Sequence, residues 1–346
     1  MKRFRKLSLV LLVTCLGLMV ASCGKKDNDK KGDTPKEVRI GIIRVPNDKQ
    51  VAISKNYFDT YFKEKGIKTK FMFFDSGVAA NQAFASNSID FAEMGYTNGV
   101  VALSTGIPVN LIWIHEILGT NEALVVHKDS AIDSVKELKG KKIATPFSST
   151  SHFSLLQCLK EAGIEKDVEL LDMETKDIVA AWERGDIDAA YTWEPTLSTI
   201  KETGKVLVDS KELAEKGHLT ANIDLVHEDF AKKYPELVED YLLSLNKGAT
   251  FYKEHPKEAA KACAHGLDIS EEEAIKQMEG TKWLTFEEEL STDYLGTTEK
   301  PGQFNTIFYE TAVFLKEQGS IQEIPSKEAI KQFIQPKYIE AAQKKE

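Results

Sequence analysis

Four hydroxyl-bearing residues stand in a row, followed by a histidine: Ser148, Ser149, Thr150, Ser151 and His152. They lie where an apolar strand pattern at 142–145 gives way to a helical pattern at 150–162. One hydroxyl is enough to cap a helix, so this turn holds more donors than capping requires. These donors, with the unpaired N–H groups and the positive end of the helix dipole, suit an anion with several oxygens, such as a sulfonate. Plain capping is the alternative.

Two further turns place polar residues where a strand pattern ends and a helix begins. Ser76 and Gly77 follow the second strand pattern of the chain, and Tyr96 and Thr97 follow the third. Ligands of open parallel sheets bind beyond the carboxyl ends of the strands, so these four residues are candidate ligand contacts. The alternatives are a helix cap for Ser76 and core packing for Tyr96.

Two acidic residues flank apolar runs at the points where the chain is expected to pass between its two halves, namely Glu122 and Asp224. A shielded carboxylate needs a partner, and a ligand ammonium would supply one. A salt bridge to a lysine or arginine of the protein, or a backbone cap, is equally compatible with the sequence. Trp193 follows a short strand pattern, where its ring either forms a wall of a ligand cleft or packs in the core.

The same residues offer little for catalysis. Ser151 and His152 are adjacent, and adjacent side chains on a helix point in different directions, so they do not form a nucleophile and base pair. The histidines are scattered and show no spacing typical of a metal site. We therefore expect a binding protein with no catalytic residue, no metal and no cofactor. An enzyme built on the same fold is the alternative.

The order of elements predicts an α/β protein with two lobes. Strand and helix patterns alternate through two series, which is typical of parallel sheets covered on both faces, and the C-terminal third is almost entirely helical. We assign 37–121 plus 223–346 to lobe 1 and 122–222 to lobe 2. Crossings at about 117–123 and 219–225 would form a hinge, with the ligand in a cleft between the lobes.

Residues 1–22 have the pattern of a lipoprotein signal peptide. Basic residues precede an apolar run at 7–21 that is short for a membrane span, and small residues lead to Cys23. We expect Cys23 to become the acylated N-terminus and 23–36 to form a flexible tether to the cell membrane, outside the cytoplasm. An uncleaved signal anchor is the alternative.

The charge balance argues against nucleic acid as a partner. The formal net charge is −9, and loss of 1–22 removes four basic and no acidic side chains, which brings it to −13. Binding to phosphate backbones needs clustered lysine and arginine instead. Cys158 and Cys263 would remain in an oxidising compartment, and since both lie in helical patterns we expect them to be unpaired core residues.

Four segments resemble the taurine-binding proteins of ABC importers, within the wider sulfonate, nitrate and taurine group. They are 74–77, 121–126, 145–156 and 180–191. The likeness spans most of 37–235 and continues more loosely to about 320.

This resemblance implies a type II periplasmic-binding-protein fold that closes on its ligand and performs no chemistry. The implied partners are a small zwitterionic sulfonate such as taurine and the permease of an importer with its ATPase, and we expect a monomer. By the same resemblance Asp224 binds the ammonium, Glu122 lies at the hinge, and 148–151 bind the sulfonate. An alkanesulfonate or another small anion is the alternative ligand. Glu194 stands where the family commonly has a small residue, which would change the charge of the cleft.

Overall fold

The computed structural model describes residues 34–346. The expected signal peptide, Cys23 and nearly all of the tether lie outside these residues. None of the described helices is both long enough and apolar enough to cross a membrane.

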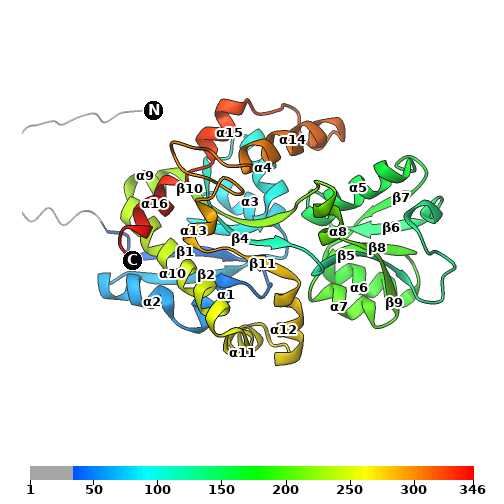
Figure 1. Cartoon of the computed structure of the whole chain (residues 1–346), viewed down its shortest axis with the longest axis horizontal. Helices are drawn as coiled ribbons and strands as arrows, with labels where there is room; N and C mark the ends of the chain where they lie inside the picture. The colour runs from blue at the N-terminus through cyan, green and yellow to red at the C-terminus, as the bar shows by residue number, and fades with distance from the viewer. Residues whose placement is uncertain (1–33) are drawn as a thin grey trace, which may run out of the picture. The chain divides into compact units, whose positions relative to one another are not determined.

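The described strands form two sheets, seen as separate groups of arrows in Figure 1. The six-stranded sheet has the order β11-β4-β10-β3-β1-β2 and the five-stranded sheet has the order β7-β6-β8-β5-β9. The bounds are β1 (Glu37–Ile42), β2 (Lys68–Phe73), β3 (Phe91–Gly95), β4 (Val109–Leu118), β5 (Glu122–His127), β6 (Lys142–Thr145), β7 (Glu169–Asp172), β8 (Ala189–Trp193), β9 (Gly204–Asp209), β10 (Ala221–His227) and β11 (Thr281–Trp283). We call the part that carries the six-stranded sheet lobe 1, and the part from Glu122 to Asp209 lobe 2.

Helices cover both sheets. In the first half of the chain they are α1 (Asp48–Ser54), α2 (Tyr57–Phe62), η1 (Lys63–Lys65), α3 (Gly77–Ala85), α4 (Tyr96–Ser104), η2 (Val135–Leu138), α5 (Thr150–Ala162) and α6 (Thr175–Arg184). In the second half they are α7 (Thr196–Lys201), α8 (Ser210–Glu215), α9 (Glu228–Lys233), α10 (Pro235–Glu254), α11 (Pro256–Leu267), α12 (Glu271–Glu279), α13 (Phe286–Glu289), α14 (Phe304–Glu317), α15 (Lys327–Phe333) and α16 (Lys337–Gln343).

The burial pattern of β5 shows why lobe 2 needs helices on both faces. Ala123 and Val125 pack in one apolar cluster, whereas Leu124 and Val126 pack in another. Because successive strand residues point to opposite faces, both faces of this sheet must be covered. The sequence thus forms a layered α/β lobe, as expected.

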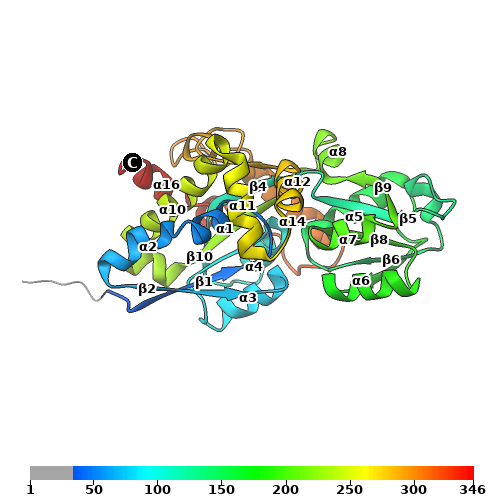
Figure 2. The same cartoon turned by 90° about the horizontal axis from the view of Figure 1, so that it is seen from below.

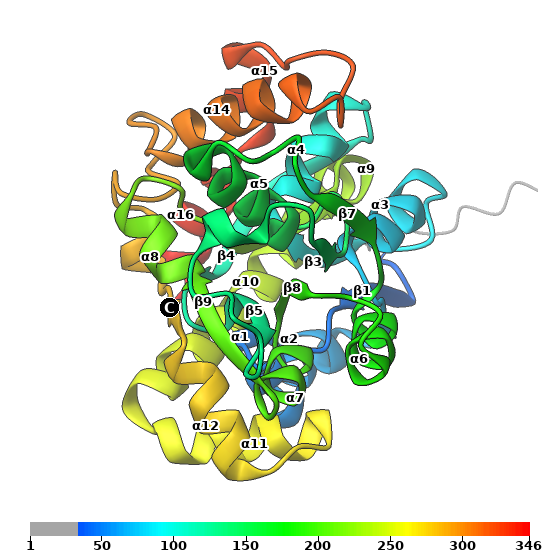
Figure 3. The same ribbon diagram turned by 90° about the vertical axis from the view of Figure 1, so that its right-hand side faces the viewer.

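The C-terminal helices return to lobe 1. Helix α11 packs against α1 and α10 and is followed by α12 (Figure 2), and α14 packs against α4. Figure 3 shows α14 close to α4 and α5, and the rings of Phe153 in α5 and Phe314 in α14 meet edge to face. Residues from both lobes therefore pack together through α14.

Four details differ from the sequence expectation. The sheets are mixed, since β10 is antiparallel to β3 and β4, and β5 is antiparallel to β8 and β9. Between β1 and β2 the sequence pattern predicts a single helix at about 48–65, but the chain is interrupted at Asn56, whose φ of 58° is left-handed. The short strand β11 joins the first sheet beside β4. Ala221 and Asn222, which we assigned to lobe 2, already pair with β4.

Candidate functional site

A cavity of about 130 Å³ lies between the two lobes. Its volume is a few times the share of one water molecule in the liquid, so it fits a small ligand. The polar residues and glycines that line it are Ser76, Gly77, Gly95, Asn98, Asn121, Glu122, Ser149, Thr150, Asp172, Glu174 and Asn222. The apolar residues are Ile43, Val45, Val78, Leu118, Pro146, Phe147 and Trp193.

Two helices begin at this cavity. Ser76 caps α3 by accepting from the N–H of Ala79, and Ser149 caps α5 by accepting from the N–H of His152. Each cap satisfies one of the donors in its first turn. The N–H groups of the first two residues of α3 and α5 have no acceptor among the described residues, as is usual at a helix N-terminus. The cavity therefore has unpaired donors and two positive dipole ends suited to an anion.

The hydroxyl groups of Ser149, which caps α5, and of Thr150 and Ser151, which begin it, have a different role from the one that we expected. Ser149 donates to the carbonyl of Pro146 at 2.5 Å, and Thr150 and Ser151 donate to Oε1 of Glu122 at 2.5 and 2.7 Å. Their protons are already engaged within the protein. Backbone N–H groups, rather than these hydroxyls, are what the turn offers to a ligand.

Glu122 is fully buried and lies at the cavity wall. Four hydroxyl groups donate to it: besides Thr150 and Ser151, Ser210 lies 2.6 Å and Thr220 lies 3.5 Å from Oε2. Burial raises the pKa of Glu122, and the hydroxyl donors oppose that rise. The carboxylate ties the start of β5 to α5 and to the chain that leads into β10.

Asp224 does not line the cavity. Its side chain is fully buried, and its Oδ2 lies 2.8 Å from Nζ of Lys49, 3.0 Å from Nε2 of His115 and 2.5 Å from the Tyr241 hydroxyl. The expected contact with a ligand ammonium is thus corrected: the positive partner of Asp224 is a lysine of the protein, which was the alternative. Burial raises the pKa of Asp224, but Lys49 and His115 outweigh it and hold that pKa below its ordinary value.

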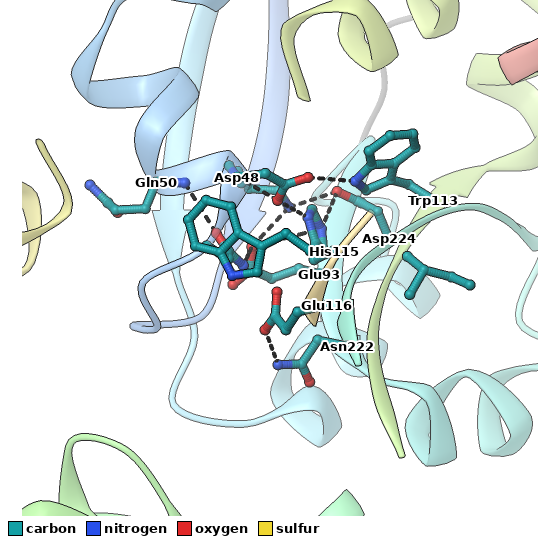
Figure 4. A network of polar contacts seen from close by, with 12 residues as sticks. Asp48, Gln50, Glu93, Trp113, His115, Glu116, Asn222 and Asp224 are labelled. Carbon is teal, nitrogen blue, oxygen red and sulfur yellow. Dashed lines mark hydrogen bonds and ion pairs between the residues drawn. The ribbon is translucent and has the colours of Figure 1, made fainter. Parts of the chain in front are cut away.

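Asp224 belongs to a larger buried network, drawn in Figure 4. His115 also contacts Asp48, which accepts from the indole of Trp113, and Lys49 pairs with Glu93 at 3.2 Å. Burial lowers the pKa of His115, but the neighbouring carboxylates outweigh burial and raise it to about 10. The network joins α1 to the strands of lobe 1 beneath the cleft.

Four other expected contacts lie behind the cavity wall. The Tyr96 hydroxyl is hydrogen-bonded to Thr311, and Thr97 donates to the carbonyl of Ser148 at 3.1 Å. Ser148 itself has a left-handed φ of 62°. The ring of His152 stacks on Phe147, and burial lowers its pKa to about 4. These residues shape the turn and the lobe contact without lining the cavity.

The cavity also contains polar residues that sequence reasoning missed. Oε2 of Glu174 is buried with no hydrogen-bond partner among the described residues, and Asp172 accepts from the N–H of Phe147 at 2.9 Å. Asn222 also lines the cavity. Only their positions in the sequence could have indicated these residues as ligand contacts. Each stands near the end of a strand or in a crossing between the lobes, where ligand contacts often occur.

The lobes touch across the cavity. The carbonyl of Ser148 in lobe 2 accepts from Oγ1 of Thr97 at 3.1 Å and from Nδ2 of Asn98 at 3.0 Å, both in lobe 1. At the rim Lys176 lies 3.8 Å from Asp75. The structure thus presents the cleft with its two sides in contact.

Two remaining expectations can be compared with the described residues. Cys158 and Cys263 are buried and unpaired, as expected. Glu194 does not line the cavity: it accepts from the N–H of Ser198 at 2.7 Å and pairs with Lys201 at 3.3 Å. Its charge is compensated within lobe 2. No group of three or more potential metal ligands occurs within 34–346.

The fold and the interlobe cavity define a two-lobed binding protein with the periplasmic-binding-protein architecture. The crystal structure of the periplasmic aliphatic sulphonate binding protein SsuA from Escherichia coli is similar, with a TM-score of 0.71 at 20% identity over 87% of this chain and 92% of that one. The chain belongs to the NMT1/THI5-like family, whose model matches residues 51–259.

Two relatives are similar in sequence over most of the chain. The taurine-binding periplasmic protein of Escherichia coli (strain K12) is 35% identical over 270 residues, which are 76% of this chain and 82% of that protein. A protein of Bacillus subtilis (strain 168), named as a candidate aliphatic sulfonates-binding protein, is 30% identical over 306 residues, 86% of this chain and 89% of its own. The resemblance drawn from the motifs is confirmed. Because both relatives are named as binding proteins, so is the expectation that the chain is not an enzyme.

Proposed function

We propose that this protein is the extracytoplasmic substrate-binding subunit of an ABC importer and that its ligand is taurine. The observation that carries the proposal is the convergence of two helix N-termini on a small cavity that also contains carboxylates. Unpaired N–H groups of α3 and α5 would bind the sulfonate. Carboxylate and amide oxygens in the same cavity would accept from the ammonium two carbons away.

The relatives support the ligand class. One is named as a taurine-binding periplasmic protein and the other is assigned to aliphatic sulfonates. The acidic residues of the cavity favour taurine over an alkanesulfonate, because a carboxylate repels an anion that brings no positive charge. The alkanesulfonate remains the second candidate, on the strength of the Bacillus subtilis relative.

The expected hydrogen-bond energies are large enough for micromolar binding of taurine. A micromolar dissociation constant corresponds to about 8 kcal/mol. Each charge-assisted hydrogen bond contributes roughly 1.5–3 kcal/mol. Three or four such bonds to the sulfonate and one or two to the ammonium supply that energy before the cost of ordering the ligand and the lobes.

Anchoring and delivery complete the proposal. Cys23 would carry the lipid, residues 23–36 would be the tether, and the closed monomer would present its ligand to the permease. Lobe 1 would comprise 37–121 with 223–346, and lobe 2 would comprise 122–222, except that β10 begins at Ala221. Closure about the two crossings would exclude water and strengthen the polar contacts.

Titration calorimetry on residues 24–346 tests the ligand. We expect taurine to bind about a hundredfold more tightly than ethanesulfonate, which keeps the sulfonate and lacks the amine, since one or two charge-assisted bonds are lost. Equal binding of both compounds would reassign the protein to alkanesulfonates. If neither bound, the sulfonate proposal would fail.

A further inference from the structure

Glu116 and Asn222 form a hydrogen-bonded pair at the wall of the cavity. Glu116 lies in β4 and Asn222 in β10, and the two residues are direct partners in the antiparallel register. These are the two strands through which the chain passes between the lobes. Asn222 lines the cavity, whereas Glu116 lies behind it with 1% of its surface exposed.

The hydrogen bond between them fixes the orientation of the amide. Nδ2 of Asn222 donates to Oε1 of Glu116 at 2.6 Å, as Figure 4 shows. Oε1 of Glu116 is the acceptor of this bond. The ionised form of Glu116, which a bound ammonium favours, can only accept, so it selects the NH₂ group of the amide and excludes the carbonyl. Oδ1 of Asn222 is consequently the atom left for the cavity, since the side-chain hydrogen bond that Asn222 makes within the described residues uses Nδ2.

We propose that Glu116 is a positioning residue that directs the carbonyl oxygen of Asn222 at the ligand ammonium and so sets the preference for zwitterionic sulfonates. This inference rests on the proposed function and deepens it. The carbonyl accepts one ammonium proton, and the carboxylate behind it supplies negative charge without touching the ligand. A free amide would present its NH₂ group as readily, and that group would repel the ammonium.

The surroundings of Glu116 make its ionisation responsive to a cation. The charged and titratable groups that face it are Asp48 from α1, Glu93 from β3, His115 from its own strand and Cys263 from α11. Burial raises the pKa of Glu116 to about 8, with His115 and the Asn222 amide opposing that rise. Its Oε2 is buried and has no hydrogen-bond partner among the described residues. An ammonium at Asn222 favours the ionised form, so binding near neutral pH releases a fraction of a proton.

The decisive comparison is Glu116→Gln against Glu289→Gln, each titrated with taurine and with ethanesulfonate. Glu289 is a matched control, because it is a buried carboxyl of lobe 1 that accepts from the backbone of β4. Its Oε2 has no hydrogen-bond partner among residues 34–346, and the Asn222 amide bonds to Glu116 instead of to Glu289. Glutamine at 116 no longer selects the orientation of the amide. We expect Glu116→Gln to weaken taurine binding about tenfold and to leave ethanesulfonate within about twofold, while Glu289→Gln changes neither.

A second variant distinguishes a role of Glu116 in orienting the Asn222 amide from a general loss of local structure. Aspartate has two acceptor oxygens and needs no orienting partner. Glu116→Gln/Asn222→Asp is therefore expected to restore taurine binding to within about threefold of the wild type. Calorimetry of the wild type in two buffers of different protonation enthalpy should also register proton release with taurine, absent with ethanesulfonate and absent in Glu116→Gln.

Several results would overturn the inference. These are equal losses for both ligands in Glu116→Gln, no loss for either, the same selective loss in Glu289→Gln, or failure of the double variant to recover. If the wild type prefers taurine strongly but Glu116→Gln does not alter that preference, only the role of Glu116 fails. If the wild type binds neither compound, the proposed function fails as well.

Discussion

Nζ of Lys49 lies 2.8 Å from Oδ2 of Asp224, and both side chains are fully buried in lobe 1. Removing one partner of such a pair leaves an uncompensated buried charge, which costs about 3–5 kcal/mol. Asp224→Asn should therefore lower the free energy of unfolding by about that amount, measured by urea denaturation. Glu161→Gln, which breaks surface pairs with Lys216 and His218, is the control and should cost about 0–1 kcal/mol. Equal losses of unfolding free energy in the two variants would contradict a buried ion pair between Lys49 and Asp224.

Two of the buried histidines, His115 and His152, should titrate on opposite sides of neutrality. The pKa of His115 is raised to about 10 by its carboxylate neighbours, against the effect of burial, and that of His152 is lowered to about 4 by burial. NMR of the imidazole rings should find His115 protonated at pH 8 and His152 neutral at pH 6. Either ring titrating near 6.5, the ordinary value, would contradict the described environments.

The raised pKa of His115 also predicts how stability varies with pH. A group whose pKa is higher in the folded state stabilises that state fully below its unfolded value, here about 6.5, and loses this contribution as pH rises through the folded value. The urea midpoint should thus fall between pH 7 and about pH 10. In His115→Gln the urea midpoint should depend less on pH over this range. If the midpoint fell as steeply in that variant as in the wild type, other groups would be responsible for the loss of stability.

Closure of the lobes can be tested at Gly95. A Cβ at this position would lie 2.8 Å from Cγ2 of Thr150, across the lobe contact. Gly95→Ala should therefore weaken taurine binding about tenfold by hindering closure, with little change in unfolding free energy. The double variant Gly95→Ala/Thr150→Ser removes the clashing methyl group and keeps the hydroxyl, so it should recover most of the affinity. Failure to recover would mean that Gly95 acts within its own lobe.

Membrane attachment depends on one thiol in this proposal. Cys23→Ser should release the protein from membranes, because the acyl chains would have no site of attachment. Fractionation of cells that express each form, followed by detection of the protein, gives the answer. Retention of Cys23→Ser in the membrane fraction would favour an uncleaved signal anchor.

The sequence predicted the architecture better than the contacts. Alternating strand and helix patterns were enough for two α/β lobes, and Pro235 and Pro256 marked the starts of α10 and α11. The antiparallel direction of β5 and β10 was not predictable from periodicity, since an apolar run has the same pattern in either direction.

At the site, helix N-termini were predictable because capping residues and strand ends are local features. Ser76, Gly77, Ser149, Thr150, Glu122 and Trp193 line the cavity. The partner of Asp224 was not predictable, because Lys49 reaches it from a distant helix. Asn222 lies two residues before Asp224 on the same strand face, and the sequence pattern does not distinguish the half-buried residue that lines the cavity from the fully buried one.

The two hydrogen bonds that the Ser148 carbonyl accepts from Thr97 and Asn98 involve no ligand atom. They must break before the cleft can open, whatever it contains. At about 0.5–1.5 kcal/mol each, they slow escape of the bound molecule by roughly tenfold or more without adding a single contact to it. Residence time is thus governed at the Ser148 carbonyl, apart from the strands β4 and β10 to which we assign selectivity, and a transport partner that pulls this carbonyl away would hasten unloading for every ligand alike.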